Sequence, residues 1–199
     1  MSSNQVLALL LGAALATAAL PMATTQQQQQ PSAEEMQKMM EKAKKWTSPG
    51  PEHKKLEPLL GKWDVDSRIG GAPAGKSKAE FSWQLEGRWL KEEVTGQLMA
   101  MPYKGFGLLG YDNFKQAYVA TWIDGLNTYK LDSQGKFDQT GKTLILYGTM
   151  DEYLTGENDK MVKYVYRWKD NDHFNFEIHD LAIGEPNTLV VDMTYVRSK

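Results

Sequence analysis

From Gly61 onward, apolar and polar residues alternate, and turn-forming residues interrupt the alternation about every eight to twelve positions. The segment around Phe81 is representative, because Ala79, Phe81 and Trp83 share one face while Glu80 and Ser82 share the other. No stretch with helical periodicity interrupts this pattern. Such a chain folds into antiparallel strands that each bury one face.

The alternation predicts a meander of eight to ten strands. The expected strands span residues 62–69, 77–85, 89–96, 106–112, 116–123, 127–132, 142–150, 161–168, 173–180 and 188–197. Turn signals such as Asp124-Gly125 and Gln134-Gly135 separate them. Because closure removes exposed sheet edges, we expect an all-β, closed antiparallel up-and-down barrel over residues 50–199.

The two ends of this region carry residues suited to closing such a barrel. Gly61 allows a tight turn into the first strand, and the Trp63 indole can plug the barrel floor. Arg197 lies in the last strand, where its guanidinium can stack on that indole. We therefore expect Trp63 and Arg197 to be in contact at the closed end.

The amino terminus resembles an export signal rather than part of the core. Val6–Leu20 is almost wholly Leu, Ala and Val, and Ala16-Thr17-Ala18 offers a cleavage site, although no Lys or Arg precedes the apolar run. We interpret residues 1–23 as a secretory signal peptide, with an uncleaved anchor as the alternative. Either places the domain in the periplasm or outside the cell. Residues 24–32 form a Gln-rich disordered linker.

Residues 33–46 are expected to form an amphipathic helix, with Ser32 as N-cap and Glu35 completing a capping box. Its methionine stripe, which includes Met39 and Met40, either packs on the barrel or covers its mouth. Residues 99–106 are rich in Met and aromatic residues and are broken by Pro102. We expect them to form a rim loop that packs on the helix or gates the lumen.

Composition excludes several functions. The chain has no cysteine, and its net charge of −2 contains no basic run, so nucleic acid is not an expected partner. Of the three histidines, His173 and His179 are ~20 Å apart at ~3.3 Å per strand residue and cannot share an ion. His53 is interpreted as a structural histidine near the barrel base. We expect no metal and no cofactor, with haem held by a single histidine as a lesser alternative.

The expected lumen is rich in aromatic side chains, which suggests a small lipophilic molecule as the partner. The ligand-binding candidates are Trp83, Glu92, Trp122, Tyr164, Tyr166, Phe174, Phe176 and Tyr195. Glu92 shares a face with Leu90 and Val94, so it either orients a ligand or reaches water at the mouth, the commoner arrangement. The alternatives are a structural or interaction barrel whose aromatics fill the core, or an enzyme using the lumenal acid with a tyrosine. No catalytic motif is present.

Gly61-x-Trp63 with Arg197 in the final strand resembles the calycin superfamily, which includes lipocalins and fatty-acid-binding proteins. A longer series also resembles a bacterial secreted family of unknown function, family 1579. It runs through Leu59-Leu60-Gly61-Lys62-Trp63, Glu86-Gly87-Arg88-Trp89-Leu90, Gly107-Leu108-Leu109-Gly110-Tyr111-Asp112-Asn113 and Thr121-Trp122-Ile123-Asp124. The resemblance covers about residues 47–197 and implies a barrel fold, without catalytic residues to carry over.

We predict that the mature protein begins between Ala19 and Gln26, because the preceding residues have the length and composition of a signal h-region. Amino-terminal sequencing of protein isolated from its own host tests this. Recovery of Met1 would contradict cleavage.

Overall fold

The computed structural model describes residues 31–152, 155–182, 184 and 188–199, so the expected signal peptide and most of the linker lie outside the described residues. The chain divides into two compact units, residues 1–39 and 40–199. Helix α1 spans Ala33–Thr47, close to its expected bounds, and has no buried residue. Its capping box is confirmed: the Glu35 backbone N–H donates to Ser32 Oγ (3.2 Å), and the Ser32 N–H donates to Glu35 Oε2 (2.8 Å). No described helix is long and apolar enough to cross a membrane.

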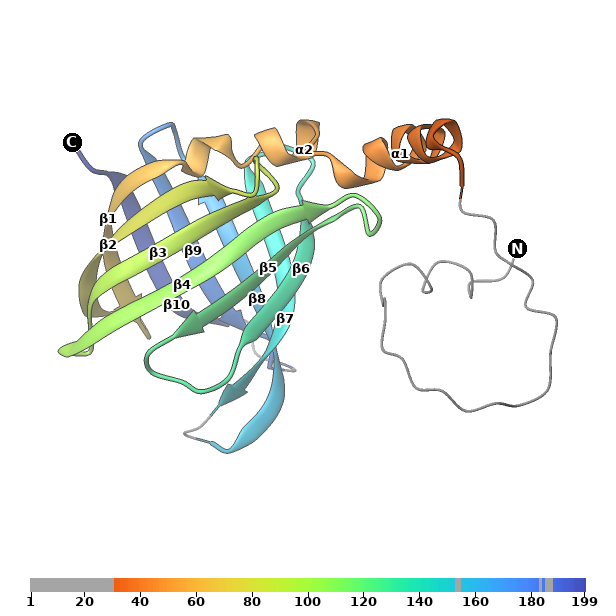
Figure 1. Cartoon of the computed structure of the whole chain (residues 1–199). Helices are drawn as coiled ribbons and strands as arrows, with labels where there is room; N and C mark the ends of the chain where they lie inside the picture. The colour runs from red at the N-terminus through yellow and green to blue at the C-terminus, as the bar shows by residue number, and fades with distance from the viewer. Residues whose placement is uncertain (1–30, 153–154, 183, 185–187) are drawn as a thin grey trace, which may run out of the picture. The chain divides into compact units, whose positions relative to one another are not determined.

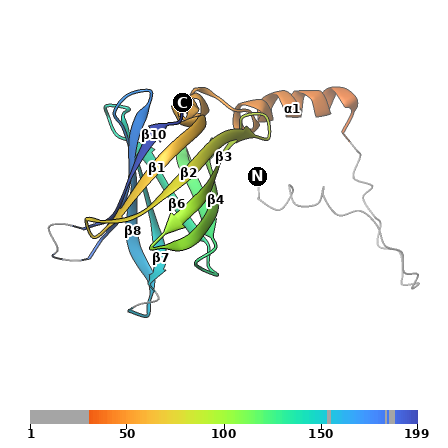
Figure 2. The same ribbon diagram turned by 90° about the vertical axis from the view of Figure 1, so that its left-hand side faces the viewer.

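The second unit is a closed barrel of ten antiparallel strands (Figures 1 and 2). The strands are β1 (Gly61–Ile69), β2 (Ala72–Gln84), β3 (Trp89–Leu98), β4 (Met101–Asp112), β5 (Ala117–Asp124), β6 (Leu131–Phe137), β7 (Thr143–Glu152), β8 (Glu157–Trp168), β9 (His173–Asp180) and β10 (Leu189–Arg197). Each strand pairs with its neighbours in sequence, and β10 returns to pair with β1. The expected up-and-down barrel is confirmed at the upper limit of the expected strand number.

Two short helices cover one end of the barrel, which we call the closed end. Helix α2 (Pro51–Lys54) and the 3-10 helix η3 (Glu57–Leu59) lie across this end, just before β1 (Figure 1). Leu56 and Leu59 are fully buried there, and the Trp63 indole N–H donates to the Leu59 carbonyl oxygen at 2.7 Å. The opposite end, called the open end, carries the β1–β2, β3–β4 and β5–β6 connections.

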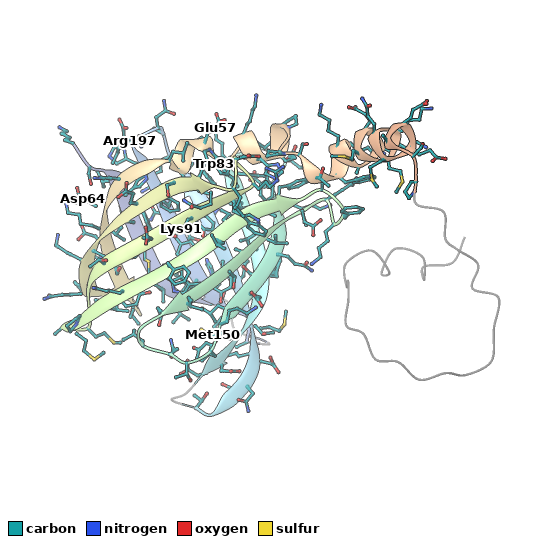
Figure 3. The ribbon with its side chains drawn as sticks, in the orientation of Figure 1. Glu57, Asp64, Trp83, Lys91, Met150 and Arg197 are labelled. Carbon is teal, nitrogen blue, oxygen red and sulfur yellow. The ribbon has the colours of Figure 1, made fainter. Side chains whose placement is uncertain are left out.

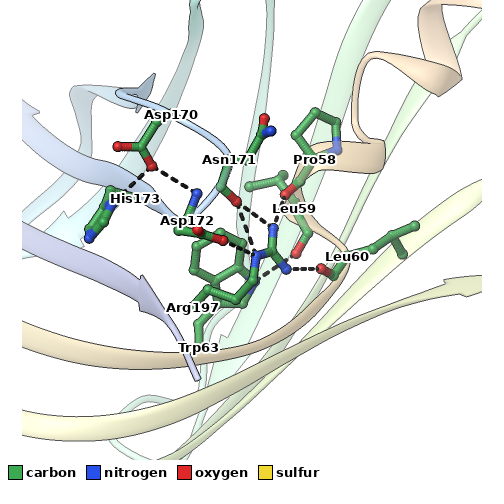
Figure 4. A network of polar contacts seen from close by, with 9 residues as sticks. All are labelled: Pro58, Leu59, Leu60, Trp63, Asp170, Asn171, Asp172, His173 and Arg197. Carbon is green, nitrogen blue, oxygen red and sulfur yellow. Dashed lines mark hydrogen bonds and ion pairs between the residues drawn. The ribbon is translucent and has the colours of Figure 1, made fainter. Parts of the chain in front are cut away.

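Arg197 joins the last strand to both the first strand and the covering helix (Figure 4). Its guanidinium carbon lies 4.2 Å from the Trp63 ring centroid, so the expected contact is confirmed. The guanidinium also donates to the carbonyl oxygens of Leu60 (2.8 Å), Pro58 (3.0 Å) and Asn171 (2.7 Å). One side chain thus connects β1, η3, the β8–β9 turn and β10.

The sixth strand was placed wrongly by the sequence, which suggested residues 127–132 followed by a turn at Gln134-Gly135. Both residues lie inside β6. A Cβ on Gly135 would lie only 1.9 Å from the Ile145 carbonyl oxygen, and one on Gly148 in β7 would lie 2.2 Å from that of Asp132. The glycines therefore permit close approach of two bent strands rather than a turn.

The rim loop expected at residues 99–106 was also wrong. Only Met99 and Ala100 form a turn, both with positive φ, and Met101 begins β4. Pro102 and Gly105 lie within that strand, where Gly105 and Gly107 leave room for the Trp122 ring to lie against the backbone. The turn is at the open end, but a two-residue connection has no length with which to gate the lumen.

We predict that Arg197→Ala lowers the free energy of unfolding by ~2–3 kcal/mol, because the variant loses the stacking on Trp63 and several charged hydrogen bonds. Arg197→Lys should recover less than half of this, since an ammonium lacks the planar fork. Urea unfolding measures both.

The matched control is Arg68→Ala, which removes an exposed arginine of β1. An equal loss of stability in Arg197→Ala and Arg68→Ala would contradict a special role for the closing contact.

Candidate functional site

The lumen has a packed half next to the closed end. Phe174 is its centre: its ring stacks on Tyr195 (4.2 Å between centroids, 20° between planes) and meets the edge of Trp63 at 4.8 Å. The buried inward-facing residues of this half, called the closed half, include Trp63, Phe81, Leu90, Leu144, Phe174 and Tyr195. These residues form the centre of the hydrophobic core.

Toward the open end, burial is mixed: Tyr103, Val162 and Tyr164 are buried, whereas six other inward-facing side chains are only partly buried. This set, called the open half, comprises Leu98, Trp122, Met150, Phe176, Ile178 and Met193. Figure 3 places Met150 at the end of the barrel opposite Arg197 and Glu57. Part of the apolar lumenal surface toward the open end is therefore accessible to solvent.

The structure divides the sequence-predicted residues between these halves. Trp122 and Phe176 belong to the open half, and Tyr164 borders it through its pairing with Ile178. Phe174 and Tyr195 are in the closed half, and Trp83 is beside the closed end, paired with fully buried Leu90. Only some of the predicted ligand-binding residues therefore line the open half, and the others belong to the core below it.

Glu92 lies inside the lumen and not at the mouth, so the mouth-level interpretation was wrong. Its residue is only 9% exposed, and Oε1 accepts a 2.9 Å hydrogen bond from the Tyr195 hydroxyl. Burial raises the pKa of Glu92 to about 7, although the Tyr195 hydrogen bond acts in the opposite direction. Burial and the nearby carboxyl raise the pKa of Tyr195 well above its usual value, so Tyr195 remains the donor.

Two further tyrosine hydroxyls lie in this region. The Tyr164 oxygen is buried and has no hydrogen-bond partner among the described residues, although the residue is only 6% exposed. Burial, and more weakly Tyr129 of the β5–β6 connection, raise the pKa of Tyr164. The pKa of Tyr166 is raised by burial, by Glu92 and by Tyr164, which places the three groups in one electrostatic neighbourhood. A buried, unpaired hydroxyl costs free energy that a bound polar group would offset.

A second polar cluster, at the open end, was missed by the sequence reasoning. Asp124 Oδ2 accepts from Trp122 Nε1 (3.1 Å) and, at the limit of bonding distance, from the Tyr103 hydroxyl (3.5 Å). Its Oδ1 accepts from the Leu126 N–H, as expected for a turn aspartate. The sequence signalled this turn role, but it gave no sign that the same carboxylate orients a lumenal indole. The sequence predicts a loop at Tyr103, which instead lies in β4.

Lys160 and Asp180 add an ion pair at this end, with 2.7 Å between Nζ and Oδ2. The register places Lys160 opposite Met150 and Asp180 opposite Val162, on the inward face. Asp180 Oδ1 is buried and has no partner among the described residues. We call Asp124, Lys160 and Asp180 the rim.

His53 is a buried structural histidine, as its position suggested. Its Nδ1 accepts a 3.1 Å hydrogen bond from the Gly50 N–H, and its ring meets Tyr111 edge-on at 6.0 Å. Burial, together with Arg88, lowers the pKa of His53, which favours the neutral ring. His53 also lines a surface hollow of about 210 Å³ outside the barrel, between residues 46–48 and the β4–β5 turn. In the part of the chain that the structure describes, no three His, Asp or Glu side chains are grouped as metal ligands.

A family model described as "Protein of unknown function (DUF1579)" matches residues 48–197. The chain belongs to this family. The match includes α2, η3 and all ten strands, so the DUF1579 region coincides with the barrel and its cover. A search of curated proteins finds no match.

Solved structures support the fold alone. The crystal structure of Rv2717c from M. tuberculosis is 17% identical, with a TM-score of 0.55, and the match covers 76% of this chain and 100% of that one. Two redesigned β-barrels are more distant. The barrel b11L5F_LGL matches at 13% identity and a TM-score of 0.41, covering 73% of this chain and 96% of its own. The barrel mFAP1, bound to DFHBI, is 14% identical with a TM-score of 0.40. That match covers 72% of this chain and 98% of the mFAP1 chain.

We predict that the wild-type protein loses up to ~3 kcal/mol of stability relative to Glu92→Gln as the pH rises from 5 to 8. The folded protein holds the Glu92 proton more tightly than the unfolded chain, since its pKa is raised to about 7 from the ordinary 4.5. The stabilisation is therefore complete at low pH and is lost as the pH rises through 7. Urea unfolding at several pH values measures the difference.

Glu93→Gln is the matched control, because Glu93 is the exposed neighbour on the outer face of β3. A stability difference between the wild type and Glu92→Gln that does not change across this range would show that the carboxyl ionises as it does in water.

Proposed function

We propose that this DUF1579 domain is an extracytoplasmic barrel that binds a small apolar or amphipathic molecule in the open half of its lumen. The observation that carries the proposal is the contrast between the two halves. The residues named for the closed half are almost fully buried, whereas the six side chains of the open half retain exposed surface. Trp83, Phe137 and Trp168, which lie nearer the closed end, are also only partly buried. A concave apolar wall with a few polar groups at its base has the properties of a small-molecule site.

The geometry assigns different roles to the candidate residues. Apolar contact comes from Trp122, Phe176 and Ile178. The Trp122 indole donates a hydrogen bond to Asp124 and lies against Gly105 and Gly107 of β4. Glu92 and Tyr164 provide polar groups deeper in the lumen. Phe174 and Tyr195 act as the base of the site and do not contribute a free wall.

Two findings favour binding over a purely structural barrel. First, the Tyr164 hydroxyl is buried without a hydrogen-bond partner among the described residues, so a bound polar group would offset its cost. Second, the partly exposed residues of the open half come from five strands around the lumen, so they do not form a single outward patch. The export signal interpreted from residues 1–23 supports the extracytoplasmic location.

We predict that the wild-type protein enhances the fluorescence of N-phenyl-1-naphthylamine, an uncharged lipophilic probe, and that Ile178→Trp weakens this binding at least fivefold. The indole would add bulk among the partly buried side chains of the open half, where the probe is proposed to bind. A fluorescence titration with unfolding curves of both proteins measures binding and fold integrity together.

The matched control is Ile123→Trp. It is the same substitution, but Ile123 lies on the outer face of β5 and is 38% exposed. This variant should bind the probe as the wild type does. If the wild type gives no enhancement, the barrel with a filled core and no ligand is the better description.

A further inference from the structure

The charges on the inward face of the barrel restrict what its lumen can accept. The strand register of the described residues shows which side chains face the lumen. Between the closed end and the rim, Glu92 is the one residue among them that can carry a charge as Asp, Glu, Lys, Arg or His. Arg197 is at the closed end and is engaged by carbonyl oxygens and Asp172. The rim itself has two carboxylates and one lysine, which is already paired with Asp180. The described lumen therefore offers acid without a free cation.

The Glu92 carboxyl group also has few hydrogen-bond donors around it. Among the described residues its oxygens accept one hydrogen bond, from Tyr195, whereas a carboxylate has about four acceptor sites. The titratable groups that face it are tyrosines: Tyr195 of β10, Tyr166 of β8 and Tyr103 of β4. A ligand that brought N–H donors and a positive charge would supply what this site lacks, and a ligand carboxylate would add a second negative charge.

The walls near Glu92 also suit a cation. The Tyr166 and Phe176 rings are 4.7 Å apart, and Phe176 stacks on Tyr164 at 6.2 Å. Aromatic faces attract ammonium groups, and the unpaired Tyr164 oxygen can accept one N–H. Tyr166 is in the electrostatic neighbourhood of Glu92 and Phe176 belongs to the open half, so these rings connect the carboxyl with the apolar surface.

Resting on the proposed function, we infer that the lumen selects a lipophilic amine, whose ammonium group ion-pairs with Glu92 and whose hydrocarbon part lies against the open half. Leu98 is six residues from Glu92 along β3, which is ~20 Å along the strand at ~3.3 Å per residue. With a typical strand tilt of ~40°, the depth is ~15 Å. An extended eight-carbon chain is no longer than this depth.

Such binding is linked to protons, because the ion pair requires ionised Glu92. The alkylammonium stays charged up to about pH 10, like lysine. With the pKa of Glu92 at about 7, amine affinity should fall about tenfold from pH 8 to pH 6. A neutral ligand of equal length should show no such change.

The experiment compares octylamine, octan-1-ol and sodium octanoate by isothermal titration calorimetry on the mature protein at pH 8 and pH 6. We expect octylamine to bind at least tenfold more tightly than octanoate at pH 8 and to lose about tenfold at pH 6. Glu92→Gln should remove this preference while octanol binding remains. Glu93→Gln, on the outer face, should behave as wild type.

The outcomes separate the two proposals. Octanoate binding as tightly as octylamine, or amine binding that ignores both pH and Glu92→Gln, would overturn the amine inference and leave lumenal binding in place. If none of the three ligands binds, and the fluorescent probe gives no enhancement either, both proposals fail. The pH dependence of the wild type decides the matter even if Glu92→Gln does not fold.

Discussion

The closure of β1 on β10 is the constraint on which the rest of the barrel depends. Seven residue pairs join these strands, and the pair nearest the closed end is Trp63 with Arg197. Because Arg197 also binds the carbonyl oxygens of Pro58 and Leu60, strand closure and the cover over the closed end are fixed by one side chain. The buried indole then fixes Phe174, and Phe174 fixes Tyr195. The hydrogen bond from Tyr195 to Glu92 extends this chain of contacts into the lumen.

This arrangement explains how a carboxyl group is tolerated at such depth. An isolated buried carboxylate is costly, and one tyrosine donor offsets only part of the cost. The remaining cost appears as a raised pKa, so the group is partly protonated near neutrality. A protein that needed only a packed core would gain stability from an apolar residue at this position.

The closing pair and the strand number could be anticipated from sequence because both depend on local pattern. Trp63 and Arg197 stand at the ends of alternating segments, and the Glu92 face follows from parity with Leu90 and Val94. The depth of Glu92 could not be anticipated, since it depends on the pairing of β3 with β2 and β4 and on the Tyr195 side chain, 103 residues away. The position of the sixth strand was predicted wrongly for a related reason. Gly135 has the sequence signature of a turn, and only its neighbour across the ladder makes it a strand residue.

The uneven filling of the lumen follows from barrel size. Eight strands give an interior that side chains just fill, and ten strands enclose more. At the closed end the extra width is occupied by the rings of Trp63, Phe174 and Tyr195 and by the leucines of the cover. Farther along, glycines at 96, 105, 107 and 148 face inward and contribute no side chains, and the Trp122 ring covers two of them. These glycines thus reduce the number of side chains that face the open half. A side chain at any of these glycines would meet a neighbouring strand or the Trp122 ring, so mutation of the glycines cannot separate the fold from the proposed site.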